Sequence, residues 1–416
     1  MQRRRSFETS AMDELKSLAE SAGYMVVGKI EQLREPDPRY QIGYGKIKEL
    51  AELVKETGAQ KIIFDNPLKP VQAYNIAKAT GVEAIDRFQL ILEIFVRRAT
   101  TTEAKLQIQL AKLKYELARA KEKVRLAKKG EQPGFMGLGA YEVDVYYETV
   151  KRQIQTINEK LKKIRRKRAL HRERRAELGF PTISLAGYTN AGKSTLFNAL
   201  TEEEVPVDDA LFTTLSTTTR LVKFSRKKFL LTDTVGFIDR LPLTLIEAFH
   251  STLEETIYSD LILLVVDVSE PLSAVEKKLS VCLETIDRIG ASGIPTITVL
   301  NKIDLLQETE VEQKIERLKE KAPKPILVSA LCRINIDNLR EEITKTLKDY
   351  VQASFTVPLT NETMNFISWL YNRADVQEIK YTGDAAHVVF EATPWFAEKA
   401  KSRVEELGGK IESFRQ

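Results

Sequence analysis

The sequence predicts an α/β protein with successive parts: a small α/β domain, a long antiparallel helical hairpin, a larger domain with a mostly parallel sheet, and a small α+β domain. Apolar runs alternate with helical patterns in residues 24–96 and again in residues 181–350. Residues 97–178 instead carry a pair of heptad patterns separated by a glycine-rich segment. We expect domains over residues 1–96, 97–178, 179–350 and 351–416.

The composition indicates a folded protein of a reducing compartment. Hydrophobic residues make up 43% of the chain, enough to build buried cores, and a net charge of +5 argues against a uniformly basic packaging protein. The low numbers of cysteine and histidine argue against a disulfide framework and a Cys/His metal centre. The longest apolar run, Leu261–Asp267, is too short to span a bilayer, and no apolar core follows the N-terminal arginines. We therefore expect a cytoplasmic protein without a membrane span.

The first domain is expected to be a small parallel unit. Three short apolar runs are predicted strands, and the two stretches with helical periodicity between them are predicted helices. The strands are Tyr24–Ile30, Gln60–Asp65 and Val82–Asp86, and the helices are Lys46–Thr57 and Val71–Thr80.

The hairpin is predicted by apolar side chains that recur alternately every three and four residues. Leu106–Leu117 carries one such series and Val143–Ile164 carries another. The segment Gly130–Ala140 between them is too rich in glycine for a helix. Two helices that pack along these apolar series would run antiparallel.

The hairpin also concentrates the positive charge. Arg97–Leu178 has a net charge of +13, whereas the rest of the chain has −8, and the densest basic stretch is Lys160–Arg175. One interpretation is a solvated helical face; the other, which segregation of the charge favours, is a contact with nucleic acid phosphates. Aromatic residues are absent from the basic stretch, so recognition of the backbone or of duplex shape fits better than base stacking.

The larger domain contains a phosphate-loop pattern between the predicted strand Thr182–Ala186 and the predicted helix Thr195–Leu200. Its glycines allow backbone N–H groups to converge on phosphate oxygens at a helix N-terminus. Lys193 would bridge the β- and γ-phosphates, and the hydroxyl of Ser194 would bind Mg²⁺. The pattern is Gly187-Tyr188-Thr189-Asn190-Ala191-Gly192-Lys193-Ser194, directly followed by Thr195.

Two further segments are expected around the phosphates. Asp233-Thr234-Val235-Gly236 follows the predicted strand Phe229–Thr232, so that Asp233 would bind Mg²⁺ and the N–H of Gly236 would sense the γ-phosphate. The threonine-rich segment Asp208–Arg220 is expected to be a switch, and one of its threonines should complete the Mg²⁺ coordination. Composition leaves open which threonine that is.

A base-recognition site is predicted after the last two strands, Thr296–Leu300 and Pro325–Ser329. In Asn301-Lys302-Ile303-Asp304, the Asp304 carboxylate can accept two hydrogen bonds from guanine, and adenine has neither donor. The stem of Lys302 can cover the base, while Asn301 can brace the loop or reach the base. A backbone N–H of Ser329-Ala330-Leu331 can meet the guanine carbonyl. Together the motifs predict a P-loop GTPase domain that binds GTP or GDP with Mg²⁺.

The last domain is predicted to be mixed. Glu378–Lys380, His387–Glu391 and Lys410–Phe414 are expected to be short strands, and Trp395–Leu407 a helix. No catalytic motif occurs in it. A docking module and a simple cap remain equal alternatives.

With these motifs in place, residues 24–350 resemble the HflX family of P-loop GTPases. The motifs that carry the resemblance follow the family order: IGYGKIKEL, DRFQLILEIF, RRATTTEAKLQIQLAKLKYEL, GYTNAGKSTLFNAL, LFTTL, DTVGFIDRLP, AFHSTLEET, NKID and SAL. The resemblance implies a GTPase that docks on the ribosome, chiefly on the large subunit through the hairpin, and that splits or rescues ribosomes. It also implies that Thr214, within Leu211-Phe212-Thr213-Thr214-Leu215, is the switch threonine, and that Asn190 lies where some relatives coordinate K⁺.

Phe237 occupies the position where Ras-like enzymes carry a glutamine that orients water. Phenylalanine cannot orient water, so intrinsic hydrolysis should be slow, and a partner, or a residue outside the motifs, must position the water. Two other functions stay open: a GTPase that acts on another RNA or in ribosome assembly, and a scaffold gated by GTP without hydrolysis. DNA binding is disfavoured because no DNA-reading helix of a recognised type is evident. We expect a monomer.

Overall fold

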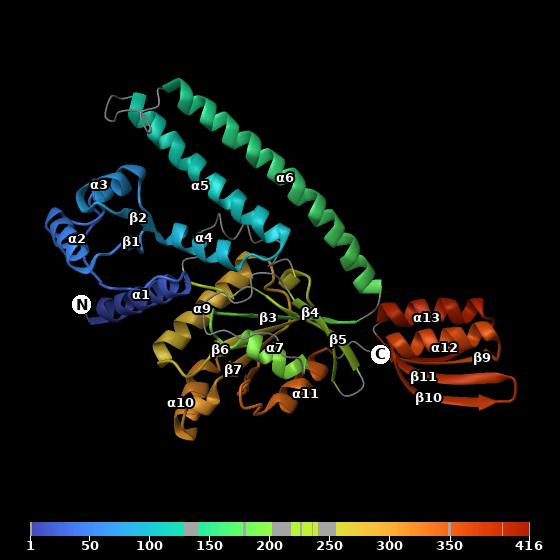
Figure 1. The fold of residues 1–416 in the computed structure, drawn as a ribbon. Helices are drawn as coiled ribbons and strands as arrows, with labels where there is room; N and C mark the ends of the chain where they lie inside the picture. The colour runs from blue at the N-terminus through green and yellow to red at the C-terminus, as the bar shows by residue number, and fades with distance from the viewer. Residues whose placement is uncertain are drawn as a thin grey trace. The chain divides into compact units, whose positions relative to one another are not determined.

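In the computed structural model, the described residues form two compact units, one up to Ile164 and one from Arg165 onward (Figure 1). Each unit is considered by itself. The residues that the structure describes are 2–128, 140–177, 180–201, 218–224, 227–234, 236–239, 255–347, 351–392 and 394–415. Among these residues, no helix has the length and apolar character needed to cross a membrane.

The first unit begins with the predicted small α/β fold. Strands β1 and β2 pair in parallel, from Lys61 opposite Glu83 to Phe64 opposite Asp86. Helices α2 and α3 pack against them around a core that includes Ile47, Leu50, Ile62 and Ile76. The elements are α1 (Gln2–Ser21), α2 (Tyr44–Thr57), β1 (Lys61–Phe64), α3 (Pro70–Thr80), β2 (Glu83–Asp86) and α4 (Arg87–Arg98).

The predicted strand Tyr24–Ile30 is wrong. These residues lie outside every strand of the described chain, and the side chain of Met25 is 84% exposed. Tyr24 is instead held through its side chain, because its hydroxyl donates to Glu93 at 2.5 Å and accepts from Lys61 at 2.9 Å. An apolar run satisfies the sequence pattern of a strand, but it cannot show that a neighbouring strand supplies the backbone partners.

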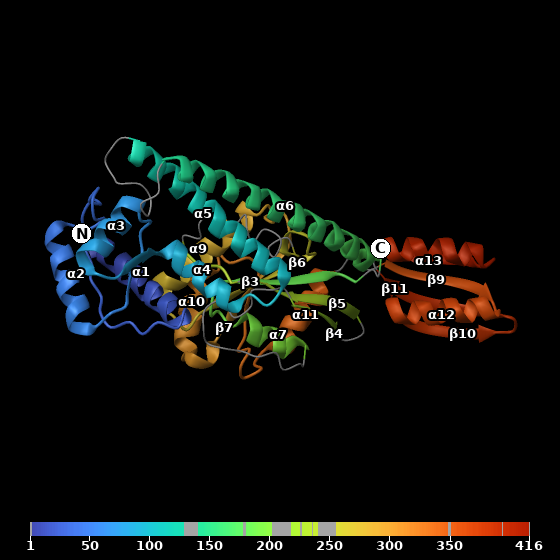
Figure 2. The same ribbon diagram turned by 45° about the horizontal axis from the view of Figure 1, so that its top comes forward.

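The helical hairpin is confirmed. Helices α5 (Thr102–Lys128) and α6 (Ala140–Glu177) run antiparallel beside each other in both views (Figures 1 and 2). The predicted apolar series meet in one seam, with Leu110, Leu113, Val150, Ile157 and Leu161 buried in it. The basic residues Lys160, Lys162, Lys163, Arg165, Arg166 and Lys167 are exposed on α6.

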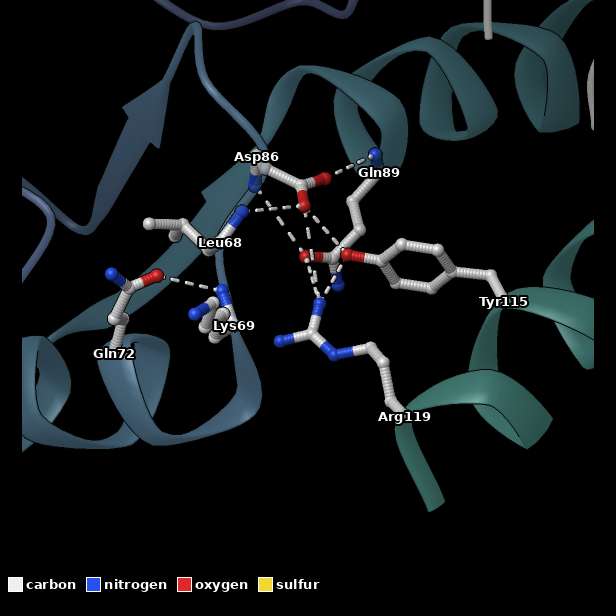
Figure 3. Close-up of polar contacts among 7 residues, drawn as sticks. All are labelled: Leu68, Lys69, Gln72, Asp86, Gln89, Tyr115 and Arg119. Carbon is white, nitrogen blue, oxygen red and sulfur yellow. Dashed lines mark hydrogen bonds and ion pairs between the residues drawn. The ribbon is translucent and has the colours of Figure 1, made fainter. Parts of the chain in front are cut away.

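A polar cluster around the buried Asp86 carboxylate fixes the middle of α5 to the α/β fold (Figure 3). The Asp86 carboxylate, at the N-terminus of α4, is 1% exposed and accepts from the backbone N–H groups of Leu68 at 3.2 Å and Gln89 at 3.1 Å. Tyr115 on α5 donates its hydroxyl to the same carboxylate at 2.6 Å, and Arg119 donates to that hydroxyl. Burial and the bond to Asp86 raise the pKa of Tyr115, so the phenol stays protonated as the donor.

Substituting Tyr115→Phe should lower the free energy of unfolding by about 1–3 kcal/mol. The buried Asp86 carboxylate loses the hydrogen bond from the Tyr115 hydroxyl, while the aromatic ring stays in place. Urea unfolding followed by circular dichroism measures this. Tyr74→Phe is the matched control, since Tyr74 is 57% exposed in the same unit. An equal loss in both variants would contradict the role of Asp86.

The second unit contains a six-stranded sheet in the order β4-β5-β3-β6-β7-β8. All neighbours pair in parallel except β4 and β5. Each strand predicted from the sequence is present, and β6 is a continuous apolar run because both faces of the sheet are covered. The elements are β3 (Thr182–Gly187), α7 (Lys193–Thr201), β4 (Thr218–Phe224), β5 (Lys227–Asp233), β6 (Leu261–Asp267), α9 (Leu272–Arg288), β7 (Thr296–Asn301), η2 (Ile303–Leu305), α10 (Glu308–Leu318), β8 (Pro325–Leu327) and α11 (Ile336–Thr346).

The C-terminal residues form a four-stranded antiparallel sheet in the order β10-β11-β9-β12, with the βαββαβ chain order of a ferredoxin-like fold. Helices α12 and α13 share one core with the sheet, through residues such as Phe366 and Phe396 (Figure 1). The predicted strands and helix are present, whereas β9 and α12 were not predicted. The elements are β9 (Val351–Pro358), α12 (Asn361–Arg373), β10 (Asp375–Thr382), β11 (Ala385–Ala392), α13 (Pro394–Glu406) and β12 (Lys410–Arg415).

Candidate nucleotide-binding site

The predicted motifs meet at one edge of the six-stranded sheet. The phosphate loop follows β3, Asp233 ends β5 and Asn301 ends β7. These strands belong to the parallel part of the sheet, so their carboxyl ends share an edge. The loops at this edge bring together residues that lie more than 100 positions apart in the sequence. Asn301, for example, donates a hydrogen bond from its side chain to the backbone carbonyl of Ala191.

Two positions of the phosphate loop accept only glycine. Gly187 has φ 148°, and a Cβ there would lie 2.2 Å from the carbonyl oxygen of Val265. Gly192 has φ 90°, and a Cβ there would lie 2.2 Å from Nδ2 of Asn301. The glycines thus allow both the left-handed turns and the close approach of neighbouring strands that shape the loop.

Lys193 lies at the centre of the loop. Its ammonium is 7% exposed and donates to the carbonyl oxygens of Gly187 at 3.1 Å and Tyr188 at 2.8 Å. Burial lowers the pKa of Lys193, and the nearby carboxylate of Asp233 counteracts part of that effect. A phosphate group at this loop would stabilise the charged form further.

The side-chain oxygen atoms of Ser194 and Asp233 lie next to each other. The Ser194 hydroxyl donates to Oδ2 of Asp233 at 3.1 Å, and Asp233 is 3% exposed. A hydroxyl beside a buried carboxylate fits a hard cation such as Mg²⁺, which prefers oxygen ligands. The third predicted ligand, Thr214, lies outside the described residues, as do Leu211, Phe212, Thr213, Leu215 and Val235.

Gly236 lies directly against the phosphate loop. A Cβ on Gly236 would lie 2.8 Å from Cγ2 of Thr189 and 3.0 Å from the ammonium of Lys193. Thr234, which precedes it by two residues, is fixed because its hydroxyl donates to the carbonyl of Leu185 at 2.5 Å. The backbone of Gly236 is therefore close enough to the lysine to approach the same phosphate.

Asn301 braces the loops on both sides of it. Its Nδ2 donates to the carbonyl of Ala191 at 2.9 Å, and its Oδ1 accepts from the N–H of Ala330 at 2.9 Å. Of the two roles predicted for Asn301, the structure has it brace the loop. Asp304 follows in η2 with an exposed side chain, and Leu331 is 78% exposed.

Sequence reasoning missed Asp267, which ends β6 and pairs with Lys302. The ammonium of Lys302 lies 2.7 Å from Oδ2 of Asp267, and Oδ1 of Asp267 accepts from the backbone and hydroxyl of Ser269. A carboxylate at the end of a predicted strand on the same edge was the signal for it. The pair fixes the end of the Lys302 side chain at the end of β6.

The two cysteines differ in environment. Cys282 on α9 is buried near the phosphate loop, and burial raises the pKa of its thiol to about 12. Cys332 is exposed, and its backbone N–H donates to the hydroxyl of Ser329 at 3.1 Å. Cys282 is therefore a neutral thiol that packs like a small apolar side chain.

Three family models match consecutive parts of the chain. A GTP-binding GTPase N-terminal model matches residues 9–96, and a GTP-binding GTPase middle-region model matches residues 98–175. A model described as 50S ribosome-binding GTPase matches residues 182–302, which include the phosphate loop and Asn301.

Similar proteins cover most of the chain. GTPase HflX of Methanocaldococcus jannaschii is 46% identical over 89% of this chain and 90% of its own length. GTPase HflX of Thermofilum pendens is 44% identical over 92% of this chain and 90% of its own length. A solved structure of a GTP-binding protein from Sulfolobus solfataricus in complex with GDP is 30% identical, covers 80% of this chain and 94% of that one, and has a TM-score of 0.45.

Substituting Asn301→Ala should weaken GDP binding by roughly 10- to 100-fold, because both hydrogen bonds that join the loops are lost. Fluorescence titration with a labelled GDP analogue measures this. Asn338→Ala is the control, since Asn338 is exposed on α11 and belongs to none of these motifs. Unchanged GDP affinity in Asn301→Ala would show that the brace does not shape the site.

Proposed function

The chain belongs to the HflX family of GTPases, and from this premise we propose how its nucleotide site works and which partner controls it. The chain binds GTP and GDP and hydrolyses GTP, as its P-loop domain and its relatives indicate. The roles of individual residues and the identity of the partner are our proposals.

The phosphate loop would hold the triphosphate with its backbone N–H groups, and Lys193 would neutralise charge on the β- and γ-phosphates. Ser194, Asp233 and Thr214 would hold Mg²⁺, which when bound would stabilise the charge that develops on the phosphate oxygens. Gly236 would contribute its N–H to the γ-phosphate. The close approach of the Gly236 backbone to Lys193, whose ammonium would lie 3.0 Å from a Cβ at position 236, supports this assignment.

Guanine recognition would rest on Asp304. Its exposed carboxylate is free of the loop-bracing role of Asn301 and would accept from the N1–H and amino group of guanine. Lys302, held by Asp267 at 2.7 Å, would lay its stem over the base. Ser329, Ala330 and Leu331 form the loop that would face the guanine carbonyl.

Hydrolysis without a partner should be slow. Phe237 is 2% exposed, so its side chain packs inside the protein, and a phenyl ring offers no hydrogen bond to an attacking water. A group from outside the phosphate site must therefore position the water. We also propose that Asn190, which has φ 61° and an exposed side chain, helps to bind K⁺, and that the bound K⁺ accelerates hydrolysis.

We propose the ribosome, chiefly its large subunit, as the partner that accelerates hydrolysis, in the splitting, rescue or recycling of ribosomes. The observation that carries this is the exposed basic face of α6, which suits RNA phosphates. The family model described as 50S ribosome-binding GTPase supports the same partner. We propose that the protein acts as a monomer in the cytoplasm.

GTP turnover should rise with large ribosomal subunits by a factor that can approach roughly 10⁵, as in other GTPases with an activating partner. Multiple-turnover phosphate release measures this, with Lys193→Ala as the blank and with K⁺ and Na⁺ buffers compared. Free ribosomal RNA and transfer RNA are the parallel arms. Activation by these RNAs alone would favour the other-RNA function, and equal rates in the two buffers would reject a K⁺ role.

Asp304→Asn should shift nucleotide preference from GTP toward XTP by roughly 10-fold or more, because the amide can donate to the xanthine carbonyl and no longer accepts both guanine donors. Competition titration against a labelled GDP analogue reports the preference. Asp337→Asn, on the exposed surface of α11, is the matched control. A variant that still prefers GTP would reject Asp304 as the base reader.

A further inference from the structure

The chain after Gly236 is joined to the phosphate loop by its backbone. The N–H of Phe237 donates to the carbonyl of Gly187 at 3.0 Å, and the carbonyl of Phe237 accepts from the N–H of Thr189 at 2.8 Å. Tyr188 and Phe237 thus form a parallel bridge. We call residues 236–239 the switch segment, because it begins at the residue proposed to sense the γ-phosphate.

The side chain of Tyr188 adds a further bond to this segment. Tyr188 is 7% exposed, and its hydroxyl oxygen accepts from the backbone N–H of Asp239 at 2.7 Å. The phosphate-loop pattern places no requirement on the residue after its first glycine. The tyrosine side chain is therefore not needed to form the phosphate loop, and its hydroxyl is available to hold the switch segment.

Two lysines of helix α9 also contact Tyr188 and Asp239. The ammonium of Lys277 lies 2.6 Å from the carboxylate of Asp239. The next residue, Lys278, lies over the Tyr188 ring, 4.9 Å from its centroid, and pairs with Glu270 at 2.5 Å. Consecutive lysines of α9 thus fix both partners of the hydrogen bond between Tyr188 and Asp239.

The bond acts close to the reacting phosphate because the switch segment is short. Asp239 lies three residues after Gly236, and a Cβ on Gly236 would lie within 3.0 Å of both Thr189 and Lys193. A displacement of Asp239 would be transmitted through Phe237 and Ile238, both 2% exposed and confined by their packing. The segment therefore has little freedom to absorb such a displacement.

We propose that Tyr188 is a positioning residue, which together with Lys277 holds the start of the switch segment so that the Gly236 N–H meets the γ-phosphate. The inference rests on the proposed function, since it assumes the γ-phosphate contact of Gly236. In this proposal, the discrimination of GTP from GDP depends on helix α9, which lies outside the nucleotide motifs. A backbone contact held in this way suits a site in which Phe237 offers no polar side chain.

The alternative is that Tyr188 only fills space in the core. Tyr188→Phe separates the two, because it keeps the ring and its contact with Lys278 and removes the hydroxyl alone. The N–H of Asp239 then loses its acceptor, and of the polar contacts described above the segment keeps only the backbone bonds of Phe237 and the ion pair of Lys277 with Asp239. GDP lacks the γ-phosphate, so its binding does not depend on the placement of Gly236.

The experiment measures the affinities of GDP and of a non-hydrolysable GTP analogue, and kcat at saturating GTP. In Tyr188→Phe, the analogue affinity and kcat should each fall by about 5- to 20-fold, while GDP affinity stays within about 2-fold. Lys277→Met should show the same selective pattern without any change in the phosphate loop. Lys345→Met, on the exposed surface of α11, is the control.

Equal losses for GDP and the analogue in Tyr188→Phe, or wild-type values in both variants, would overturn the inference and leave the proposed function intact. If Tyr188→Phe does not fold, Lys277→Met carries the test, and an unchanged ratio of affinities in it rejects the role. Wild-type protein that binds neither nucleotide would overturn the proposed function, and the inference with it.

Discussion

The amide of Asn301 is the contact on which the geometry of the nucleotide site depends. It is 2% exposed and joins the phosphate loop at Ala191 to the base-side loop at Ala330. It reaches Ala191 only because Gly192 has no side chain. One planar group with a donor and an acceptor thus joins the phosphate loop to the loop that we propose faces the guanine. The parallel sheet brings the loops near each other, and the amide fixes their separation.

Elements could be predicted from the sequence where the residue pattern and the neighbouring elements indicate the same structure. The phosphate loop could be predicted because its glycines, lysine and hydroxyl are contiguous and flanked by strand β3 and helix α7. Strand β6 could be predicted because a strand buried on both faces is almost continuously apolar, here from Leu261 to Val266. Tyr24–Ile30 failed for the opposite reason: its side chains look like a strand, and no backbone partner exists for it among the described strands.

Long-range polar pairs were the part that the sequence did not reveal. Lys302 with Asp267, Asn301 with Ala330, and Tyr188 with Asp239 each join residues from separate motifs. Periodicity carries no information about such pairs, because they depend on how loops close in three dimensions. The polar cluster of Asp86, Tyr115 and Arg119 is a further example. It fixes the middle of α5 to the α/β fold through polar bonds, whereas the hairpin seam, which the heptads did predict, is apolar.

The contrast between the two thiols has a practical consequence. Cys282 is buried and protonated at neutral pH, whereas Cys332 is exposed three residues after Ser329, and the chain has no third cysteine. A maleimide dye would therefore attach selectively at position 332 of the folded, otherwise native protein. The fluorophore would lie next to Leu331, in the loop that we propose faces the guanine, so it would test that proposal by its response to nucleotide without any engineered residue.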